Sequence, residues 1–377
     1  MAEYLTNDIE LTSVADAIRG KGGTSDPLTY PDGFANAVRA IQTGIVPQLV
    51  VTVSAGATVT ATNGSKTISG TSDSTGVCTL IVPEIGTWSV SATLGGQTSD
   101  TKTVSITDSY AVSLYFVSST LNDNEWSVIK SVSDAGQGAN YWSIGDRKEV
   151  ILDGTVGHLA LSNYTTYAFI IGFNHNQELE GTNRIHFQLA KTALSGGTDV
   201  CFCDSYYTSP VSTTGYFSMN SSATNSGGWE NSQMRTNICG TSLSNYSGTM
   251  IAVIPDALRA VLKSVTKYTD NTGNNSTSAS AVTATKDYFF LLSEFEVFGS
   301  ISRANSNEAS KQAQYAYYSA GNSKVKYKHN GTSAAARWWL RSPLASNSDG
   351  FEDVNTNGTV EDRTARASFG FAPGFCV

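Results

Sequence analysis

The sequence predicts a multidomain chain with a short N-terminal helical segment, an all-β immunoglobulin-like sandwich and a larger C-terminal α+β domain. Its 377 residues exceed the usual length of one domain, about 150 residues. Only 15% of the residues are charged, whereas 17 Tyr, 15 Phe and 34 Gly suit short strands, tight turns and ordered loops. The spacing of apolar residues also changes twice along the chain, which places domain boundaries near residues 45 and 118.

Residues 1–44 contain two short predicted helices. In each, apolar residues recur at the spacing of one helical face, a capping residue or a proline precedes them, and a glycine follows. These apolar positions are Leu11, Val14 and Ile18 in the first helix and Phe34, Val38 and Ile41 in the second. Because two such helices bury little surface by themselves, we predict that residues 1–44 form a docking or oligomerisation segment.

Residues 46–117 alternate apolar and polar side chains, which is typical of strands with one buried face. Asn63-Gly64 is a strong signal for a tight hairpin turn, and Gly or Asp residues separate the other strands. About seven short strands in this length predict an immunoglobulin-like sandwich with Trp88 in its core. The region contains no pattern that suggests chemistry, so we expect it to act as a spacer.

Residues 118–377 mix helix, strand and loop, and this mixture predicts an α+β domain. LNDNEWSVIK begins like a helix, and a strand follows it. IPDALRAVLKSVTKY predicts an amphipathic helix that buries Leu258, Val261, Leu262 and Val265. DYFFLLSEFEVFG predicts an apolar strand, and YTDNTGNNSTSASAVTATKD predicts a polar, mobile loop.

Charge and hydropathy exclude several classes of protein. The net charge of −8 and the pI near 5.0 argue against a nucleic-acid partner. No apolar run approaches the ~20 residues of a membrane-spanning helix, so no membrane insertion is expected. The first residues, MAEYLTNDIE, lack the features of a secretion signal, which predicts synthesis in a bacterial cytoplasm.

Candidate catalytic and metal-binding residues are few. The four histidines share no motif, and the chain has neither a G-x-S-x-G elbow nor a phosphate-binding loop. The five cysteines are an odd and scattered set. Cys201 and Cys203 lack a second pair at zinc spacing, so buried thiols are favoured over disulfides or a metal site. Glu294 and Glu296 would share one face of the predicted strand, which leaves a glycan-degrading carboxylate pair open as an alternative. Otherwise the sequence predicts no catalytic residue, no cofactor and no metal.

The last forty residues have large apolar side chains at both ends and small polar ones between them. Trp338 and Trp339 precede the polar stretch, and Phe369, Phe371 and Phe375 follow it, spaced as in a closing strand. Two interpretations remain open from composition alone. The middle is either a recognition surface held by an aromatic framework or an ordinary solvated loop.

WWLRSP, a polar stretch and FGFAPGFCV follow one another at the C-terminus. This arrangement resembles C-type-lectin-fold proteins that are diversified by retroelements, a family widespread in gut bacteria and their phages. GGWENSQMRTNICG, IPDALRAVLKSVTKYT, KDYFFLLSEFEVFG and QYAYYSAGNSKVKYKHNGTSAAARWWLRSP occur in the order of that family, and EWSVIKSVSDAGQGANYWSIGDRKEVIL resembles its opening. The resemblance spans about residues 120–377. ELTSVADAIRGKGGTSDPLTYPDGFANAVRAI resembles the start of phage tail and baseplate-associated proteins, and residues 46–117 resemble their immunoglobulin-like spacers.

The resemblance implies three domains and a variable region. The domains are residues 1–44, 46–117 and 118–377, the last with a C-type-lectin-like fold shared with formylglycine-generating enzymes. The variable region covers about residues 344–368, where error-prone copying of template adenines rewrites selected codons. The implied ligand-binding residues are Leu344, Ala345, Asn347, Asp349, Glu352, Asp353, Asn355, Thr356, Asn357, Thr359, Asp362, Arg363, Thr364 and Arg366. The implied framework residues are Trp338, Trp339, Arg341, Phe351, Val354, Gly358 and Phe375.

The resemblance also implies a function. On this resemblance, we expect a phage receptor-binding or host-adhesion protein of the virion that is not an enzyme and forms a homotrimer. Its partners would be phage tail or baseplate proteins and a host cell-surface protein or glycan. The chain lacks the Glu-Pro-Asn and Trp-Asn-Asp sets of calcium-dependent lectins and the catalytic cysteines of formylglycine-generating enzymes, so neither calcium nor that chemistry is implied. A glycan-degrading tail enzyme and a purely structural baseplate or decoration protein are the alternatives.

Overall fold

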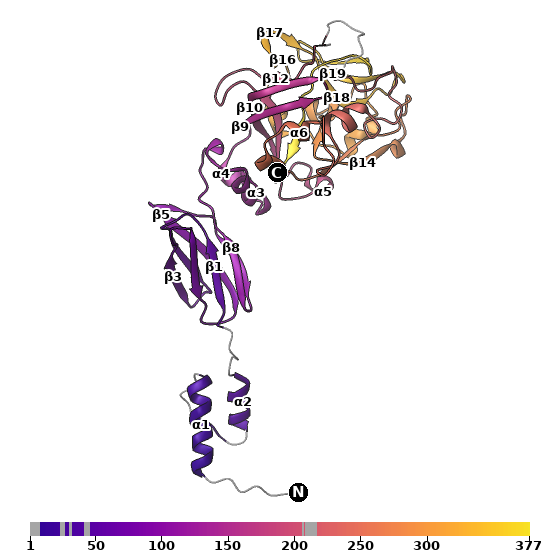
Figure 1. The fold of residues 1–377 in the computed structure, drawn as a ribbon. Coiled ribbons are helices and arrows are strands. Elements are labelled where there is room, and N and C mark those ends of the chain that lie inside the picture. The colour runs from indigo at the N-terminus through magenta and orange to yellow at the C-terminus, as the bar shows by residue number, and fades with distance from the viewer. Residues whose placement is uncertain (1–7, 23–26, 30–31, 41–45, 206, 208–216) are drawn as a thin grey trace. The chain divides into compact units, whose positions relative to one another are not determined.

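The computed structural model describes residues 8–22, 27–29, 32–40, 46–205, 207 and 217–377 (Figure 1). The chain is multidomain and rich in β-sheet, and it divides into an N-terminal unit, Met1–Phe116, and a C-terminal unit, Val117–Val377. The third region predicted from the sequence starts at residue 118, next to this division. No helix within the described residues is long and apolar enough to cross a membrane.

Two helices, α1 (Asp8–Gly22) and α2 (Asp32–Ala40), form where the sequence predicts them. The buried row of α1 keeps the predicted Ile18 but contains Ala15 in place of Val14. Ala15 and Ile18 are buried, whereas Val14 is 50% exposed. Val38 of α2 is 52% exposed, and Ile41 lies outside the described residues.

Eight strands follow in the N-terminal unit. They are β1 (Gln48–Thr52), β2 (Thr58–Thr62), β3 (Thr67–Thr71), β4 (Val77–Ile81), β5 (Gly86–Leu94), β6 (Gln97–Thr98), β7 (Lys102–Ile106) and β8 (Ser109–Ser113). One sheet has the order β4-β1-β8, and the other has the order β3-β2-β5-β6 with β7 also paired to β5. Gly64, with φ of +87°, lies in the turn of the predicted β2–β3 hairpin. Trp88 is fully buried in the core of this region, as the alternating pattern predicts.

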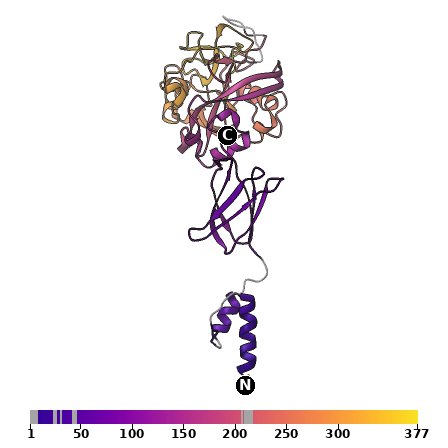
Figure 2. The ribbon, with the colours of Figure 1, turned by 90° about the vertical axis from the view of Figure 1, so that its left-hand side faces the viewer.

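The C-terminal unit contains short helices around several small sheets (Figure 2). Its helices are α3 (Trp126–Asp134), α4 (Gly138–Tyr141), α5 (Gln177–Glu180), α6 (Met250–Val253), α7 (Asp256–Arg259), α8 (Glu294–Phe298) and α9 (Ala316–Ser319). Its strands are β9 (Arg147–Val156), β10 (Leu159–Phe173), β11 (Ile185–Lys191), β12 (Val200–Cys201), β13 (Val265–Asp270), β14 (Val282–Asp287), β15 (Phe289–Phe290), β16 (Lys326–Lys328), β17 (Gly331–Ala336), β18 (Trp338–Pro343), β19 (Gly350–Val354), β20 (Val360–Thr364) and β21 (Gly374–Cys376).

The largest sheet of the C-terminal unit pairs strands from the beginning of the unit with strands from its end. Its order is β15-β21-β11-β10-β9, so the C-terminal strand β21 lies between β15 and β11. Every residue of β11 is buried. Phe187 of β11 stacks on Phe375 of β21 at 5.2 Å between ring centroids, and Trp126 of α3 meets Phe187 edge-on at 5.7 Å. Three further sheets have the orders β12-β16-β17, β13-β14 and β18-β19-β20.

The prediction of one helix over IPDALRAVLKSVTKY is correct only for the first helical turn and wrong for the rest. Only Asp256–Arg259 is helical, and β13 begins at Val265. Leu258, Val261 and Leu262 are nevertheless buried, so the pattern located the apolar side chains correctly. From Val265 onward burial follows the two-residue period of a strand, which brings Lys267 and Thr269 into the interior.

The strand predicted over DYFFLLSEFEVFG is also only partly correct. β15 covers two residues, and α8 then begins at Glu294. The Ser293 side chain accepts a hydrogen bond from the Glu296 backbone N–H, and the Glu296 side chain accepts one from the Ser293 N–H. This reciprocal capping starts a helix, and the S-x-x-E spacing is its sequence signal. The predicted polar loop is shorter than expected, because β13 and β14 occupy both of its ends.

Candidate functional site

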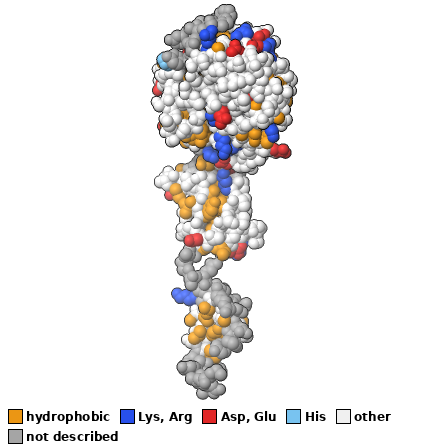
Figure 3. Space-filling view, turned by 90° about the vertical axis from the view of Figure 1, so that its right-hand side faces the viewer, with side chains coloured by type: hydrophobic (Ala, Val, Ile, Leu, Met, Phe, Trp, Pro, Cys, Tyr) orange, Lys and Arg blue, Asp and Glu red, His pale blue; other side chains and the backbone are white. Residues whose placement is uncertain are grey.

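The C-terminal polar stretch folds into the sheet β18-β19-β20, in which β19 is the middle strand. Strands β18 and β19 lie in the half of the C-terminal unit that is farther from α3 and α4 (Figure 1). The β19–β20 register pairs Phe351 with Arg363 and Asp353 with Glu361. The turn between them contains Gly358, whose φ of +84° favours glycine. Side chains of both charges lie together at this end of the unit (Figure 3).

The predicted framework residues other than Gly358 lie inside the unit. Trp338, Trp339, Arg341, Phe351, Val354 and Phe375 are all fully buried. The indole N–H of Trp338 donates to the Lys324 carbonyl at 2.9 Å, and that of Trp339 donates to the Phe217 carbonyl at 2.9 Å. Because both large rings are packed and both polar N–H groups are satisfied, β18 has a fixed position under the polar stretch.

Most of the predicted ligand-binding residues reach the surface. Five are exposed, namely Asp349, Thr356, Asn357, Thr359 and Arg366. Six are half-buried, namely Ala345, Asn347, Asn355, Asp362, Arg363 and Thr364. We call these eleven residues the polar surface. They come from the β18–β19 connection, the β19–β20 turn, β20 and the residues just after it, so they all belong to one sheet and its loops.

Three predicted ligand-binding residues are instead buried, and this part of the prediction is wrong. Leu344 is 2% exposed, and Glu352 and Asp353 are 0% exposed. The reason is that β19 has a strand on each side and is covered on both faces. Nη1 of the buried Arg337 donates to both carboxylate oxygens of Asp353, at 3.1 and 3.0 Å. These three side chains therefore cannot contact a ligand in this fold.

Glu352 forms a buried acidic pair with Glu294 of α8. No hydrogen-bond donor among the described residues reaches either carboxyl oxygen of Glu352. Burial, and then the adjacent Glu294, raise the pKa of Glu352 well above its ordinary value. The Glu294 carboxylate accepts hydrogen bonds from the backbone N–H groups of Ser302 (2.7 Å), Arg303 (3.2 Å) and Ala304 (3.1 Å). The protonated side chain of Glu352 therefore lies next to the Glu294 carboxylate, which holds the backbone of residues 302–304 in place.

A pocket opens beside the polar surface at this segment. Its volume is ≈ 630 Å³, and it is lined by Ser302, Arg303, Ala304, Ala345, Ser346 and Val360. The Arg303 carbonyl accepts a hydrogen bond from Ala345 N–H at 3.0 Å, which ties the segment to the β18–β19 connection. The Arg303 side chain forms ion pairs with Asp362 and, at 3.9 Å, with Glu361. Our sequence reasoning missed Arg303, because only the fold brings it next to β20.

A buried network of ion pairs surrounds Lys267 of β13 and Arg341 of β18. Nζ of Lys267 donates to Glu180 (2.7 Å), Glu296 (2.9 Å) and the Tyr315 hydroxyl (2.8 Å). The Arg341 guanidinium donates through both terminal nitrogens to the same Glu296 carboxylate, with Nη2–Oε1 at 2.9 Å. Burial alone would raise the pKa of Glu296, but Arg341 and Lys267 together hold it below its ordinary value. The network joins β13, α5, α8 and β18 in the interior.

The same region contains the grouping of potential metal ligands found among the described residues, His175, Glu180 and Glu296. All three are buried. The ammonium group of Lys267 already bonds both carboxylates, so it occupies the position that a cation would take. Burial lowers the pKa of His175 to about 3, so this imidazole is neutral in the core. We interpret the group as part of the ion network.

Part of this unit is similar to a known family. Residues 210–377 match a family described as "Domain of unknown function (DUF6273)". The match covers fewer than half of the residues of the chain. None of the curated proteins compared with the chain matches it. The matched segment contains the polar surface together with Lys267, Glu296 and Arg341, whereas the ion-network residue Glu180 lies before it.

The remaining chemical candidates are structural in this fold. Glu294 and Glu296 are 1% and 0% exposed, lie on a helix and bind different partners, so their geometry does not support a glycan-cleaving pair. All five cysteines are buried and free, as the sequence predicts. The sulfur atoms of Cys201 and Cys203 are 3.9 Å apart, and the Cys203 N–H donates to His329 Nδ1.

The acidic pair predicts a pH effect on stability. Because the pKa of Glu352 is higher in the folded unit than in the unfolded chain, the folded unit binds more protons above about pH 4.5. Stability should therefore fall as the pH rises from this value through the folded pKa. Glu352→Gln should remove this loss, so the stability of this variant relative to the wild type should be greater at pH 8 than at pH 5. Thermal unfolding at both pH values tests this, with the exposed Asp349→Asn as control. Parallel pH profiles of Glu352→Gln and the wild type would contradict it.

Proposed function

We propose that this protein is a phage receptor-binding or host-adhesion protein that presents the polar surface as a variable ligand-binding site. The observation that carries the proposal is the separation of two sets of side chains in one small sheet. The aromatic anchors of β18 and β19 are fully buried, while the small polar residues of their loops and of β20 are exposed or half-buried. Exchange of the second set should leave the contacts of these buried aromatic residues intact, which suits a site that must accept many sequences.

The resemblance to retroelement-diversified C-type-lectin-fold proteins supports this reading and gives the other regions a role. Residues 1–44 would dock to a phage tail or baseplate, residues 46–117 would form an immunoglobulin-like spacer, and residues 118–377 would carry the site on a C-type-lectin-like scaffold. The protein would act in the virion as a homotrimer and would not be an enzyme. Several weak sites on one particle raise the avidity by about 10²–10⁴ without new contacts, which favours such an assembly.

The pocket at Arg303 gives the proposed site a fixed element beside the variable ones. Its backbone is held by Glu294, and its side chain lies against Asp362 and Glu361. Residues at 345 and 360 shape the pocket walls, and the residue at 362 determines how far the Arg303 charge is neutralised. Variation at 345 and 362 would therefore change both the shape and the charge offered to a host cell-surface protein or glycan.

A graft of the polar surface tests the proposal. The eleven residues are replaced by a different set of small polar and aromatic residues, while Leu344, Glu352 and Asp353 are retained. Substitutions at the surface usually change the stability by no more than about 0.5 kcal/mol in either direction, so gains and losses should partly offset and the melting temperature should shift by only a few degrees. Binding of the purified protein to a panel of gut bacterial cells should change. Unaltered cell binding, or a loss of many degrees in melting temperature, would overturn the proposal.

A matched graft separates display from folding. It carries the same eleven changes together with Glu352→Ala and Asp353→Ala. Because these two side chains are buried and interact with Glu294 and Arg337, this second graft should unfold at a clearly lower temperature. Equal melting temperatures for the two grafts would show that the division between polar surface and interior is wrong.

A further inference from the structure

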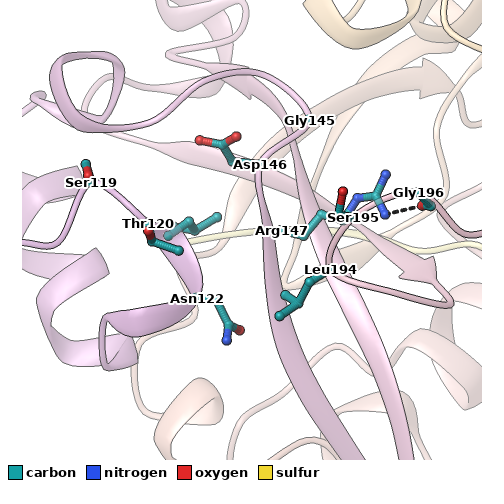
Figure 4. Close-up of a pocket in the computed structure, with 10 residues that line it drawn as sticks. Ser119, Thr120, Asn122, Gly145, Asp146, Arg147, Leu194, Ser195 and Gly196 are labelled. Carbon is teal, nitrogen blue, oxygen red and sulfur yellow. Dashed lines mark hydrogen bonds between the residues drawn. The ribbon is translucent and has the colours of Figure 1, made fainter.

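A second cavity lies in the C-terminal unit at the start of β9, apart from the polar surface (Figure 4). Its volume is ≈ 390 Å³. It is bounded by the 119–122 segment, by residues 145–147 and by the 194–196 turn. Small-ligand sites typically have volumes of about 300–1,000 Å³, so the cavity is large enough for a compact molecule.

Arg147 supplies the positive charge of this cavity. Its Nη1 donates hydrogen bonds to the carbonyl oxygens of Ala193 (2.6 Å) and Gly196 (2.5 Å). These two bonds fix the plane of the guanidinium group. Carbonyl groups are neutral, however, and no described carboxylate forms an ion pair with Arg147. The half-buried cation is therefore held in place without direct contact to a carboxylate of the described residues.

The two bonds occupy both N–H groups of Nη1 and leave those of Nε and Nη2. The Nε–Nη2 edge of a guanidinium presents two parallel donors, and this geometry binds a carboxylate through two hydrogen bonds. The hydrogen bonds to the Ala193 and Gly196 carbonyls therefore use only Nη1 of Arg147. The edge that recognises carboxylates has no partner among the described residues.

The other lining groups restrict the kind of anion that fits. Asp146 points away from Arg147 (Figure 4), and its Oδ2 accepts a hydrogen bond from Ser143 N–H at 2.8 Å. A second negative charge on the ligand would face this carboxylate and be repelled. Ser119, Asn122 and Ser195 contribute neutral polar groups. The cavity thus favours a small ligand that carries a single carboxylate and further polar groups.

We propose that the cavity beside Arg147 is a binding site for the carboxylate of a small ligand, with the Nε–Nη2 edge of Arg147 as its recognition element. An acidic monosaccharide and the carboxyl end of a peptide both supply this group. The site is separate from the polar surface, so it stands whether or not the polar surface binds a host receptor.

Titration of the full chain with two carboxylates tests the site. The Nε–Hε signal of Arg147 and the backbone N–H signals of Ser195 and Gly196, which line the cavity, are followed by NMR while D-glucuronate or N-acetylglycine is added, with D-glucose as the neutral control. Saturable shifts with a Kd of about 1 mM are expected for at least one carboxylate, since this affinity corresponds to one charged two-point contact. The stronger binder identifies the source of the carboxylate. Linear, unsaturated shifts with both, or equal shifts with D-glucose, would overturn the proposal.

Three variants assign the binding to this cavity. Arg147→Gln should abolish saturation of the Ser195 and Gly196 signals, while Lys286→Gln, which changes an exposed cation of β14 outside both proposed sites, should leave it intact. Asp146→Asn keeps Arg147 and its turn in place and removes the neighbouring negative charge, so it should tighten binding about twofold to fivefold. Asp146→Asn remains informative if Arg147→Gln disturbs the 194–196 turn. Unchanged affinity in Asp146→Asn, or equal losses in Arg147→Gln and Lys286→Gln, would contradict the assignment.

Discussion

Arg341→Met is expected to lower the free energy of unfolding of the C-terminal unit by about 3–5 kcal/mol, the usual cost of breaking a buried ion pair. Arg341 is fully buried, and it donates hydrogen bonds to other acceptors besides Glu296. Its Nε donates to the Thr269 hydroxyl at 2.7 Å and its Nη1 to the Leu291 carbonyl at 2.8 Å. Methionine fills much of the volume but leaves these acceptors, and half of the Glu296 charge compensation, without a partner.

Urea unfolding followed by tryptophan fluorescence measures this effect. Of the six tryptophans, Trp88 lies in the N-terminal unit and the other five lie in the C-terminal unit, so the signal reports mainly on the latter. Arg341→Lys should fall between the wild type and Arg341→Met, because one ammonium group cannot replace the guanidinium fork at three acceptors. Arg366→Met, at an exposed position, should change the stability by less than about 0.5 kcal/mol. If all three variants matched the wild type, the ion network would not stabilise this unit.

The sequence predicts those parts of the fold that depend on local patterns. Alternation over residues 46–117 predicts the strands and the burial of Trp88. The aromatic residues at the ends of the C-terminal stretch predict a buried anchor, and Trp338 and Trp339 provide it. In these cases the period of the pattern or the size of the apolar side chain is enough to predict burial, whichever residues cover it.

Long-range partners explain the failures. Lys267 enters the core because Glu180 and Glu296 surround it, and this favours strand over the helix that the apolar spacing predicts. Glu352 and Asp353 lie in a polar stretch, yet Glu294 and Arg337 bury them with partners that their own segment does not contain. Arg303 joins the polar surface for the same reason. None of these pairings leaves a periodic signal in one sequence.

Asp353→Ala is the second change for which we expect a loss of about 3–5 kcal/mol, because it leaves the Arg337 guanidinium buried without its carboxylate. Burial, opposed in part by Arg337, raises the pKa of Asp353 to about 7, so unfolding should be measured at pH 8, where the carboxylate is charged. Asp349→Ala, four residues earlier and exposed, is the matched control and should cost less than about 0.5 kcal/mol.

The double variant Asp353→Leu with Arg337→Met completes this test, because it removes both charges and fills the space with apolar groups. It should recover most of the stability lost in Asp353→Ala, since a buried ion pair and an apolar pair of similar volume are often equally stable. Diversification at 353 would therefore require a matching change at 337, whereas position 349 can vary alone. If Asp353→Ala were as stable as Asp349→Ala, the interior position of Asp353 would be wrong, and the polar surface would extend across β19.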